Sequence, residues 1–188
     1  MKKELPEHPP VFLIGFMGAG KSTTGKLLAA ALEYQFVDLD AAIELVAGKS
    51  ISKIFNEEGE KAFRGYEQEV LHQLGQRSEI VVATGGGCGA NPENVKWMNK
   101  NGICIYLKTQ AGVLFHRLAP QKSKRPLISG LTDVSLMEYI MDLLMIRETV
   151  YRQAEYIVDG EKTAKEVCRE MIQRINHQSF SGLEERAS

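Results

Sequence analysis

The feature that most limits how this chain can fold is a glycine-rich octapeptide at residues 15–22, Gly-Phe-Met-Gly-Ala-Gly-Lys-Ser. It matches the pattern GxxxxGK(S/T) at every position, and it lies between the apolar run Val11–Ile14 and a segment with helical spacing that starts at Lys21. Its glycines let successive backbone N–H groups turn toward an anion, and the helix N-terminus adds partial positive charge. The octapeptide therefore predicts a strand, a phosphate-binding loop and a helix in succession.

Two side chains at the end of the octapeptide complete the predicted phosphate site. Lys21 can reach the terminal phosphates of a nucleoside triphosphate, and the Ser22 hydroxyl can bind Mg²⁺. The alternative is a glycine turn that only connects a strand to a helix. It is disfavoured because average composition produces the full pattern in on the order of one chain in a hundred of this length.

The alternation of strand and helix continues along the chain. Four further apolar runs have the length of buried strands: 36–37, 80–83, 103–107 and 156–158. Helical spacing occupies 41–47, 52–74, 110–118 and 133–153, Asn91 with Pro92 opens a helix, and Thr163 with Glu166 forms a capping box for the last one. Alternating strands and helices predict an α/β fold with a parallel sheet covered on both faces. We expect a single domain at 11–177, a flexible lead at 1–10 and a flexible tail at 178–188.

Composition restricts the class of protein. The chain has 188 residues with 44% hydrophobic and 25% charged, which is typical of a globular domain, and its net charge of -1 disfavours nucleic-acid and membrane-surface partners. The 3 cysteines contain no CxxC pair and the 4 histidines are scattered, so no disulfide framework or zinc cluster is expected. No segment resembles a secretory signal or a membrane span. These features favour a cytoplasmic protein.

Two carboxylates follow the second predicted strand. Strand alternation places Asp38 and Asp40 on the same face, at a strand end that lines the ligand crevice of a parallel sheet. One carboxylate there can serve the metal, and the other can orient or deprotonate an acceptor hydroxyl. The alternative is a solvated turn in which Asp40 caps the next helix.

Several basic residues are candidates for binding anions. Arg64 has Glu60 and Glu67 at helical spacing, so a surface ion-pair ladder explains it equally well. Arg147 borders an apolar helical stripe, where it either reaches water or is held for an anion.

The polar segment 119–130 predicts a surface loop that closes over phosphates as a lid, with a solvated loop as the alternative. Positive charge comes from Lys122, Lys124 and Arg125 within the segment and from Arg117 just before it. The run Thr84–Gly87 is a second place where bare backbone can approach a ligand, or else a mobile turn.

Taken together, these segments resemble shikimate kinase from about Val11 to Ile175. Six motifs carry the resemblance, in the family's order: GFMGAGKS at 15–22, Asp38-x-Asp40, GExxFRxxE at 59–67, Gly85-Gly86-Gly87, Arg125-Pro126-Leu127 and Arg147-x-x-x-Tyr151. The resemblance implies a P-loop three-layer α/β/α fold with a five-stranded parallel sheet, adenylate-kinase-like, with a mobile lid. It also implies ATP-dependent phosphorylation of the 3-hydroxyl of shikimate on the way to aromatic amino acids, by a monomer.

The resemblance also implies roles for individual residues. Shikimate is expected at Asp40, Arg64, Gly86 and Arg147, and the substrate-binding helices are expected at about 40–74. ATP is expected at Gly18, Ala19, Gly20, Lys21, Ser22, Thr23, Arg117 and Arg125, with Arg117 beside the adenine and Arg125 closing from the lid. Ser22 and, through water, Asp38 correspond to the Mg²⁺ ligands. Lys21, Asp40 and Arg125 are the expected catalytic residues.

Other readings of the sequence remain open at this point. Gluconate kinase or another small-metabolite kinase would share the phosphate loop but should lack the combination of FRxxE, triple glycine and paired arginines. A GTPase would carry an NKxD motif, and the nearest match, Asn99-Lys100-Asn101-Gly102, lacks the aspartate. A catalytically dead relative is disfavoured because Lys21, Ser22, Asp38 and Asp40 are all present.

Overall fold

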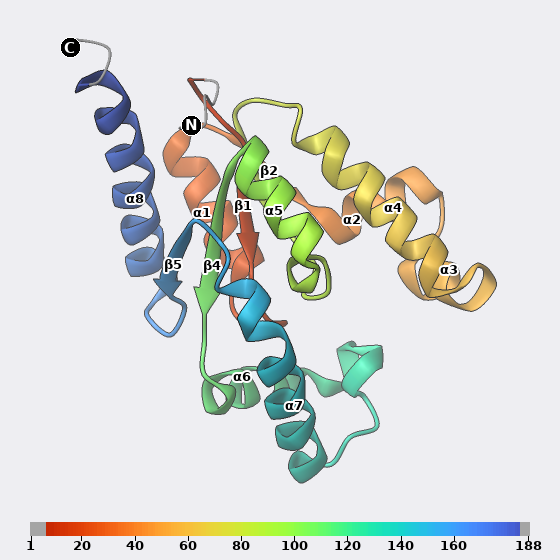
Figure 1. Cartoon of the computed structure of the whole chain (residues 1–188). Helices are drawn as coiled ribbons and strands as arrows, with labels where there is room; N and C mark the ends of the chain where they lie inside the picture. Colours follow the sequence, from red (N-terminus) through yellow and green to blue (C-terminus); the bar gives the residue numbers. More distant parts are fainter. Residues whose placement is uncertain (1–6, 185–188) are drawn as a thin grey trace.

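A five-stranded parallel sheet runs through the centre of the computed structural model (Figure 1). The structure describes residues 7–184, without the side chains of Lys124, Pro126 and 177–184. The strands are β1 Val11–Ile14, β2 Gln35–Asp38, β3 Ile80–Ala83, β4 Ile103–Lys108 and β5 Tyr156–Asp159. They lie in the order β2-β3-β1-β4-β5, and every neighbouring pair is parallel.

The strand order reverses at β1. β3 pairs with one edge of β1, where Leu13 lies opposite Ala83, and β4 pairs with the other edge, where Leu13 lies opposite Ile105. Ligands of open parallel sheets bind beyond the carboxyl ends of the strands at such a reversal. The glycine-rich loop follows β1 directly, so the topology places that loop at the expected ligand crevice.

Helices cover both faces of the sheet. They are α1 Lys21–Leu32, α2 Leu39–Ala47, α3 Ile51–Glu57, α4 Gly59–Leu74, α5 Pro92–Asn101, α6 Ala111–Leu118, α7 Asp133–Tyr151 and α8 Ala164–Glu184. Alternate residues of β1 supply two separate cores. Val11 and Leu13 pack with residues of α1, α6 and α8, whereas Phe12 and Ile14 pack with residues of α4 and α5. All four side chains are fully buried, which is why this strand is apolar at every position.

The fold class predicted from the sequence is confirmed, and most element bounds agree within about two residues, the usual scatter of helix and strand ends. The single helix predicted at 52–74 is wrong. The chain forms α3 and α4, separated at Glu58, because Gly59 has a φ of 82° that a continuous helix does not allow. The break sets α2, α3 and α4 against one another beside the β2 edge of the sheet (Figure 1).

Backbone hydrogen bonds and helical structure extend into both of the segments expected to be flexible. The carbonyls of His8 and Pro10 accept hydrogen bonds from the N–H groups of Glu79 and Ile103, and Pro10 is buried. Residues 8–10 of the expected lead therefore lie along the sheet, and 1–6 fall outside the described residues. Helix α8 continues to Glu184, through most of the expected tail, and 185–188 are not described.

The expected loop at 119–130 is built from short helical turns. These are the 3₁₀ turns η2 Ala119–Lys124 and η3 Pro126–Ile128. Another 3₁₀ turn, η1 Cys88–Ala90, follows the triple glycine. Ile128 is fully buried in the same core as Leu136 and Ile140 of α7, and it anchors the segment there. No helix among the described residues has the length and apolar character needed to cross a membrane.

Candidate active site

The glycine-rich loop wraps around the side chain of the lysine that follows it. Gly15, Gly18 and Gly20 have φ values of 141°, 80° and 99°, in the range that only glycine adopts readily. The Lys21 ammonium donates to the carbonyl oxygens of Gly15 at 2.8 Å and Phe16 at 2.9 Å. Burial lowers the pKa of Lys21 to about 8, although the charge of Asp40 acts in the opposite direction. The loop thus holds an ammonium group whose pKa, about 8, is well below that of an exposed lysine.

The two predicted carboxylates lie at the end of β2 and in the first turn of α2. The Ser22 hydroxyl donates to Asp38 Oδ2 at 2.9 Å, and Asp38 Oδ1 accepts from the N–H of Asp40 at 3.2 Å. Asp38 therefore caps α2. The alternative interpretation, in which Asp40 caps this helix, is wrong. The expectation that strand alternation places both carboxylates on one face is also wrong, because the strand ends at Asp38. Asp40 reaches the site as a helical residue.

The environment of Asp40 disfavours its charged form. Burial and the neighbouring Asp38 carboxylate raise the pKa of Asp40, whereas Lys21 partly offsets them. Because its carboxylate can then accept a proton more readily than an exposed aspartate, the position suits a group that handles an acceptor hydroxyl.

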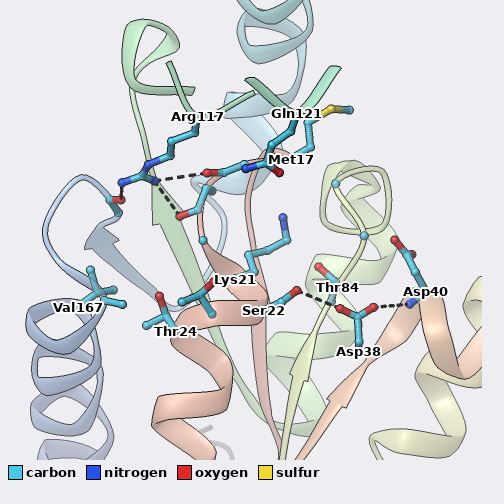
Figure 2. A pocket seen from close by; sticks show the side chains of 18 of the residues that line it. Met17, Lys21, Ser22, Thr24, Asp38, Asp40, Thr84, Arg117, Gln121 and Val167 are labelled. Atoms are coloured by element: carbon cyan, nitrogen blue, oxygen red, sulfur yellow. Dashed lines mark hydrogen bonds between the residues drawn. The ribbon is translucent and has the colours of Figure 1, made fainter. Parts of the chain in front are cut away.

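A cavity of about 430 Å³ lies over the glycine-rich loop. Its wall is formed by the loop and the start of α1, the carboxyl ends of β2 and β3, the segment from α6 to η2, and the β5–α8 turn. In Figure 2, Lys21 points into this space, Ser22, Asp38 and Asp40 lie along one side, and Arg117 with Gln121 lies on another. The cavity extends from the glycine-rich loop to Gly85 and Gly86 of the triple glycine.

The triple glycine after β3 is pinned against β1. Both the N–H and the hydroxyl of buried Thr84 donate to the carbonyl of Leu13, at 3.1 and 3.0 Å. A methyl group at Gly85 would lie 2.7 Å from a carboxylate oxygen of Asp40, which shows how closely that carboxylate approaches the bare backbone. The space for a side chain at Gly85 is limited by the Asp40 carboxylate and not by backbone conformation.

The next two glycines are approached in the same way by two arginines. A methyl group at Gly86 would lie 3.6 Å from Arg147 Nη1, and one at Gly87 would lie 2.9 Å from Arg64 Nη1. A carboxylate from α2 and guanidinium groups from α4 and α7 therefore converge on one tripeptide. We call this arrangement the triple-glycine site: Asp40, Arg64, Gly85–Gly87 and Arg147.

Arg64 is held by carboxylates on its own helix. Its Nη1 donates to both oxygens of Glu67, at 3.1 and 3.0 Å, and its Nη2 donates to Glu60 at 3.1 Å. The ion pairs that formed the alternative reading of Arg64 are therefore present. The Glu67 side chain, however, is only 3% exposed, and burial raises its pKa while the Arg64 charge lowers it. Because Glu67 is buried, its two hydrogen bonds fix the position of the Arg64 guanidinium, which an exposed ion pair would not do.

Arg147 lies between the glycine-rich loop and the triple glycine. Its Nη1 is 3.4 Å from the carbonyl oxygen of Gly86, and its guanidinium carbon is 5.8 Å from the centre of the Phe16 ring. One turn later on α7, the Tyr151 hydroxyl donates to the same carbonyl at 2.6 Å. The last turns of α7 are thus attached to the Gly86 peptide.

Arg117 ties the phosphate loop to the β5–α8 turn. Its guanidinium donates to the carbonyls of Gly18, Ala19 and Gly160, at 3.4, 3.3 and 3.0 Å (Figure 2). Of the other basic residues of the lid segment, Arg125 lines the cavity, while Lys122 donates to Asp133 at 2.6 Å. The side chain of Lys124 is not described.

Comparisons with known proteins identify the family of this chain. A model of the family described as shikimate kinase matches residues 17–176. This chain belongs to the shikimate kinase family. Shikimate kinase from Bacteroides fragilis is 41% identical over 152 residues, which cover 81% of this chain and 85% of that protein. The resemblance seen in the sequence is therefore confirmed.

Solved structures of the family have the same fold. The crystal structure of shikimate kinase from Bacteroides thetaiotaomicron superposes with a TM-score of 0.85 at 34% identity, over 89% of this chain and 98% of that one. Shikimate kinase from Acinetobacter baumannii, solved in complex with shikimate, has a TM-score of 0.81 at 35% identity, over 92% and 95% of the two chains.

The structure brings most of the predicted site residues to one place. The cavity is lined by every residue predicted to bind ATP: Gly18, Ala19, Gly20, Lys21, Ser22, Thr23, Arg117 and Arg125. Asp38, Asp40 and Gly86 line it too, whereas Arg64 and Arg147 are not part of its lining and lie beside Gly87 and Gly86. Sequence reasoning missed the parts played by Gln121, Lys162, Thr84 and the Tyr151 hydroxyl. Gln121 and Lys162 have no local sequence signal for the site, whereas Thr84 and Tyr151 lie in segments that the sequence singled out without indicating what their side chains contact.

Proposed function

We propose that this member of the shikimate kinase family transfers the γ-phosphoryl group of ATP to the 3-hydroxyl of shikimate, on the route to aromatic amino acids. The observation that carries the proposal is the triple-glycine site, where one carboxylate and two guanidinium groups converge beside a phosphate-binding loop. Shikimate carries a carboxylate for the guanidinium groups and hydroxyls for Asp40. We further propose that the protein acts as a monomer in the cytoplasm.

ATP fits the loop end of the cavity. The β- and γ-phosphates would lie on the N–H groups of the glycine-rich loop and the start of α1, with the Lys21 ammonium beside them. Arg125 of the lid segment faces the same cavity and would neutralise charge on the transferred group. The edges of Arg117 are occupied by three carbonyls, so its flat face is the part left to stack on the adenine.

A magnesium ion fits the pair formed by Ser22 and Asp38. Their hydroxyl and carboxylate oxygens are hard ligands 2.9 Å apart at the cavity wall. Among the described residues no group of three or more His, Cys, Asp or Glu is gathered for a metal, and Mg²⁺ needs none, since water and phosphate oxygens complete its octahedron. When bound, the ion would neutralise charge on the phosphates, with Ser22 as a direct ligand and Asp38 acting through water.

The acceptor fits the triple-glycine site. Arg64 and Arg147 would pair with the carboxylate of shikimate, and the Gly86 backbone would lie against it. The 3-hydroxyl oxygen then forms its bond to the γ-phosphorus while the bond from that phosphorus to the leaving β-phosphate oxygen breaks. Asp40 takes the hydroxyl proton, a step that its raised pKa favours. Lys21 and Arg125 stabilise the charge that develops on the phosphoryl oxygens.

A coupled ADP-release assay tests the proposal with shikimate, quinate and gluconate side by side. We expect turnover with shikimate and much less with the other two acids. Asp40→Asn is nearly isosteric and should lower kcat by roughly 10²- to 10⁴-fold without changing KM for ATP, because an amide cannot accept the proton. Equal turnover with gluconate, or a normal kcat in Asp40→Asn, would contradict the proposal.

A further inference from the structure

The last turn of α7 contributes a buried hydroxyl to the triple-glycine site. Tyr151 is fully buried, its ring stacks on Tyr106 of β4 with 5.1 Å between the ring centres, and its hydroxyl donates to the Gly86 carbonyl at 2.6 Å. Burial raises the pKa of Tyr151 to about 12, although the charge of Arg147 and a side-chain hydrogen bond with it act in the opposite direction. The hydroxyl therefore keeps its proton, and remains a donor, around neutral pH.

The same carbonyl has a second donor close by. Arg147 precedes Tyr151 by one helical turn, and its Nη1 is 3.4 Å from the Gly86 oxygen, much longer than the 2.6 Å of the tyrosine. A charged donor at 3.4 Å makes a weak bond that a small rotation would shorten to about 2.9 Å. The Gly86 carbonyl is partly buried, so leaving it without a donor would cost part of the free energy of a hydrogen bond.

We propose that Tyr151 is a positioning residue for Arg147: its hydroxyl satisfies the Gly86 carbonyl and thereby leaves the arginine free to bind the acceptor's carboxylate. Without the hydroxyl, the Gly86 carbonyl recruits Arg147 as its donor. The guanidinium then turns toward the protein, and the planar fork that a carboxylate requires is lost. This inference rests on the proposed function, since it presumes that the acceptor is an acid.

Tyr151→Phe tests the inference because it removes one oxygen and keeps the ring stack. We expect KM for shikimate to rise about tenfold, the size of effect that loss of a charged hydrogen bond produces. KM for ATP should stay within about twofold, because the phosphate loop makes no bond to the tyrosine. The preference for shikimate over its neutral methyl ester should fall by a similar factor. Thermal unfolding checks that each variant is folded.

Tyr106→Phe is the matched control, since it removes a hydroxyl from the same ring pair without touching the Gly86 carbonyl. It should leave both KM values unchanged. A double variant, Arg147→Ala with Tyr151→Phe, should be no worse than Arg147→Ala alone, because the tyrosine acts through the arginine.

Three results would overturn the inference: an unchanged KM and ester preference in Tyr151→Phe, equal effects on ATP and shikimate, or the same effect in Tyr106→Phe. Each would mean that Tyr151 only supports packing. Failure of the proposed function looks different. In that case the wild-type protein itself would not turn over shikimate, and Tyr151→Phe would have no acid preference to lose.

Discussion

Alanine at Gly85 or at Gly87 adds one methyl group on either side of Gly86, and the structure predicts a different kinetic loss at each position. The Gly85 methyl would lie 2.7 Å from Asp40, and the Gly87 methyl 2.9 Å from Arg64. Neither Gly85 nor Gly87 is among the glycines with positive φ, so alanine fits the backbone at both. The atoms that clash are the far ends of side chains, which can move aside. Both variants should therefore fold.

The size of each loss follows from how far the side chain has to move. The Asp40 carboxylate must shift by roughly 0.7–1 Å to reach ordinary contact distance. A misplacement of that size costs a reacting group up to about a hundredfold, so kcat of Gly85→Ala should fall by about 10- to 100-fold, or roughly 1.4–2.7 kcal/mol. In Gly87→Ala the displaced group is Arg64. Part of a charged hydrogen bond is lost, and KM for shikimate should rise by about three- to tenfold with a smaller change in kcat.

Steady-state kinetics with both substrates varied, together with thermal unfolding, decides the matter. Gly65→Ala is the control: it lies beside Arg64 in α4, and a methyl group there would meet nothing within 4 Å. It should leave both constants unchanged and slightly raise the melting temperature, because alanine favours helix. The reasoning is refuted if Gly85→Ala keeps the wild-type kcat, or if both glycine variants show one common pattern.

Two further perturbations address the nucleotide end of the cavity. Because burial lowers the pKa of Lys21 to about 8, the ammonium loses its proton as the pH rises through that value, and the affinity for ATP should fall above it by up to about tenfold per pH unit. Calorimetric titration from pH 7 to 9.5 measures this, and Lys21→Met should bind more weakly and lack the slope; an identical slope in both proteins would exclude Lys21 as its source. The segment 119–130 should close when nucleotide binds. Hydrogen exchange with and without a non-hydrolysable ATP analogue should then show protection there, and equal exchange in both states would count against closure.

Local signals in the sequence predicted much of this fold. The continuous apolar run of β1 and the octapeptide after it defined the strand, the loop and α1. Asn91 accepts from the N–H of Glu93 as the expected cap of α5, and the Thr163–Glu166 capping box forms ahead of α8. Each of these depends on residues within one turn of each other, which is why a single sequence suffices to find them.

Features that depend on tertiary structure were not accessible in this way. The helical spacing continues across Glu58, so only the positive φ of Gly59 reveals the break between α3 and α4. Tyr151 and Gly86 are 65 residues apart, and they meet because α7 returns over the carboxyl end of β3. Asp40 lines the cavity, but not through the strand alternation expected from the sequence, since the Asp38 side chain caps a helix that begins before the alternation can continue.

The central claim of the proposed function is that Arg64 and Arg147 bind the acceptor's carboxylate. The most direct test compares kcat/KM for shikimate with that for its methyl ester in the wild type and in Arg64→Ala and Arg147→Ala. Arg152→Ala, which removes an exposed ion pair with Glu148 at the end of α7, is the control. We predict a strong preference for the acid in the wild type and the control, and a loss of about ten- to a hundredfold of it in each arginine variant. If both arginine variants keep the wild-type preference, the carboxylate is bound elsewhere and the proposed acceptor site is wrong.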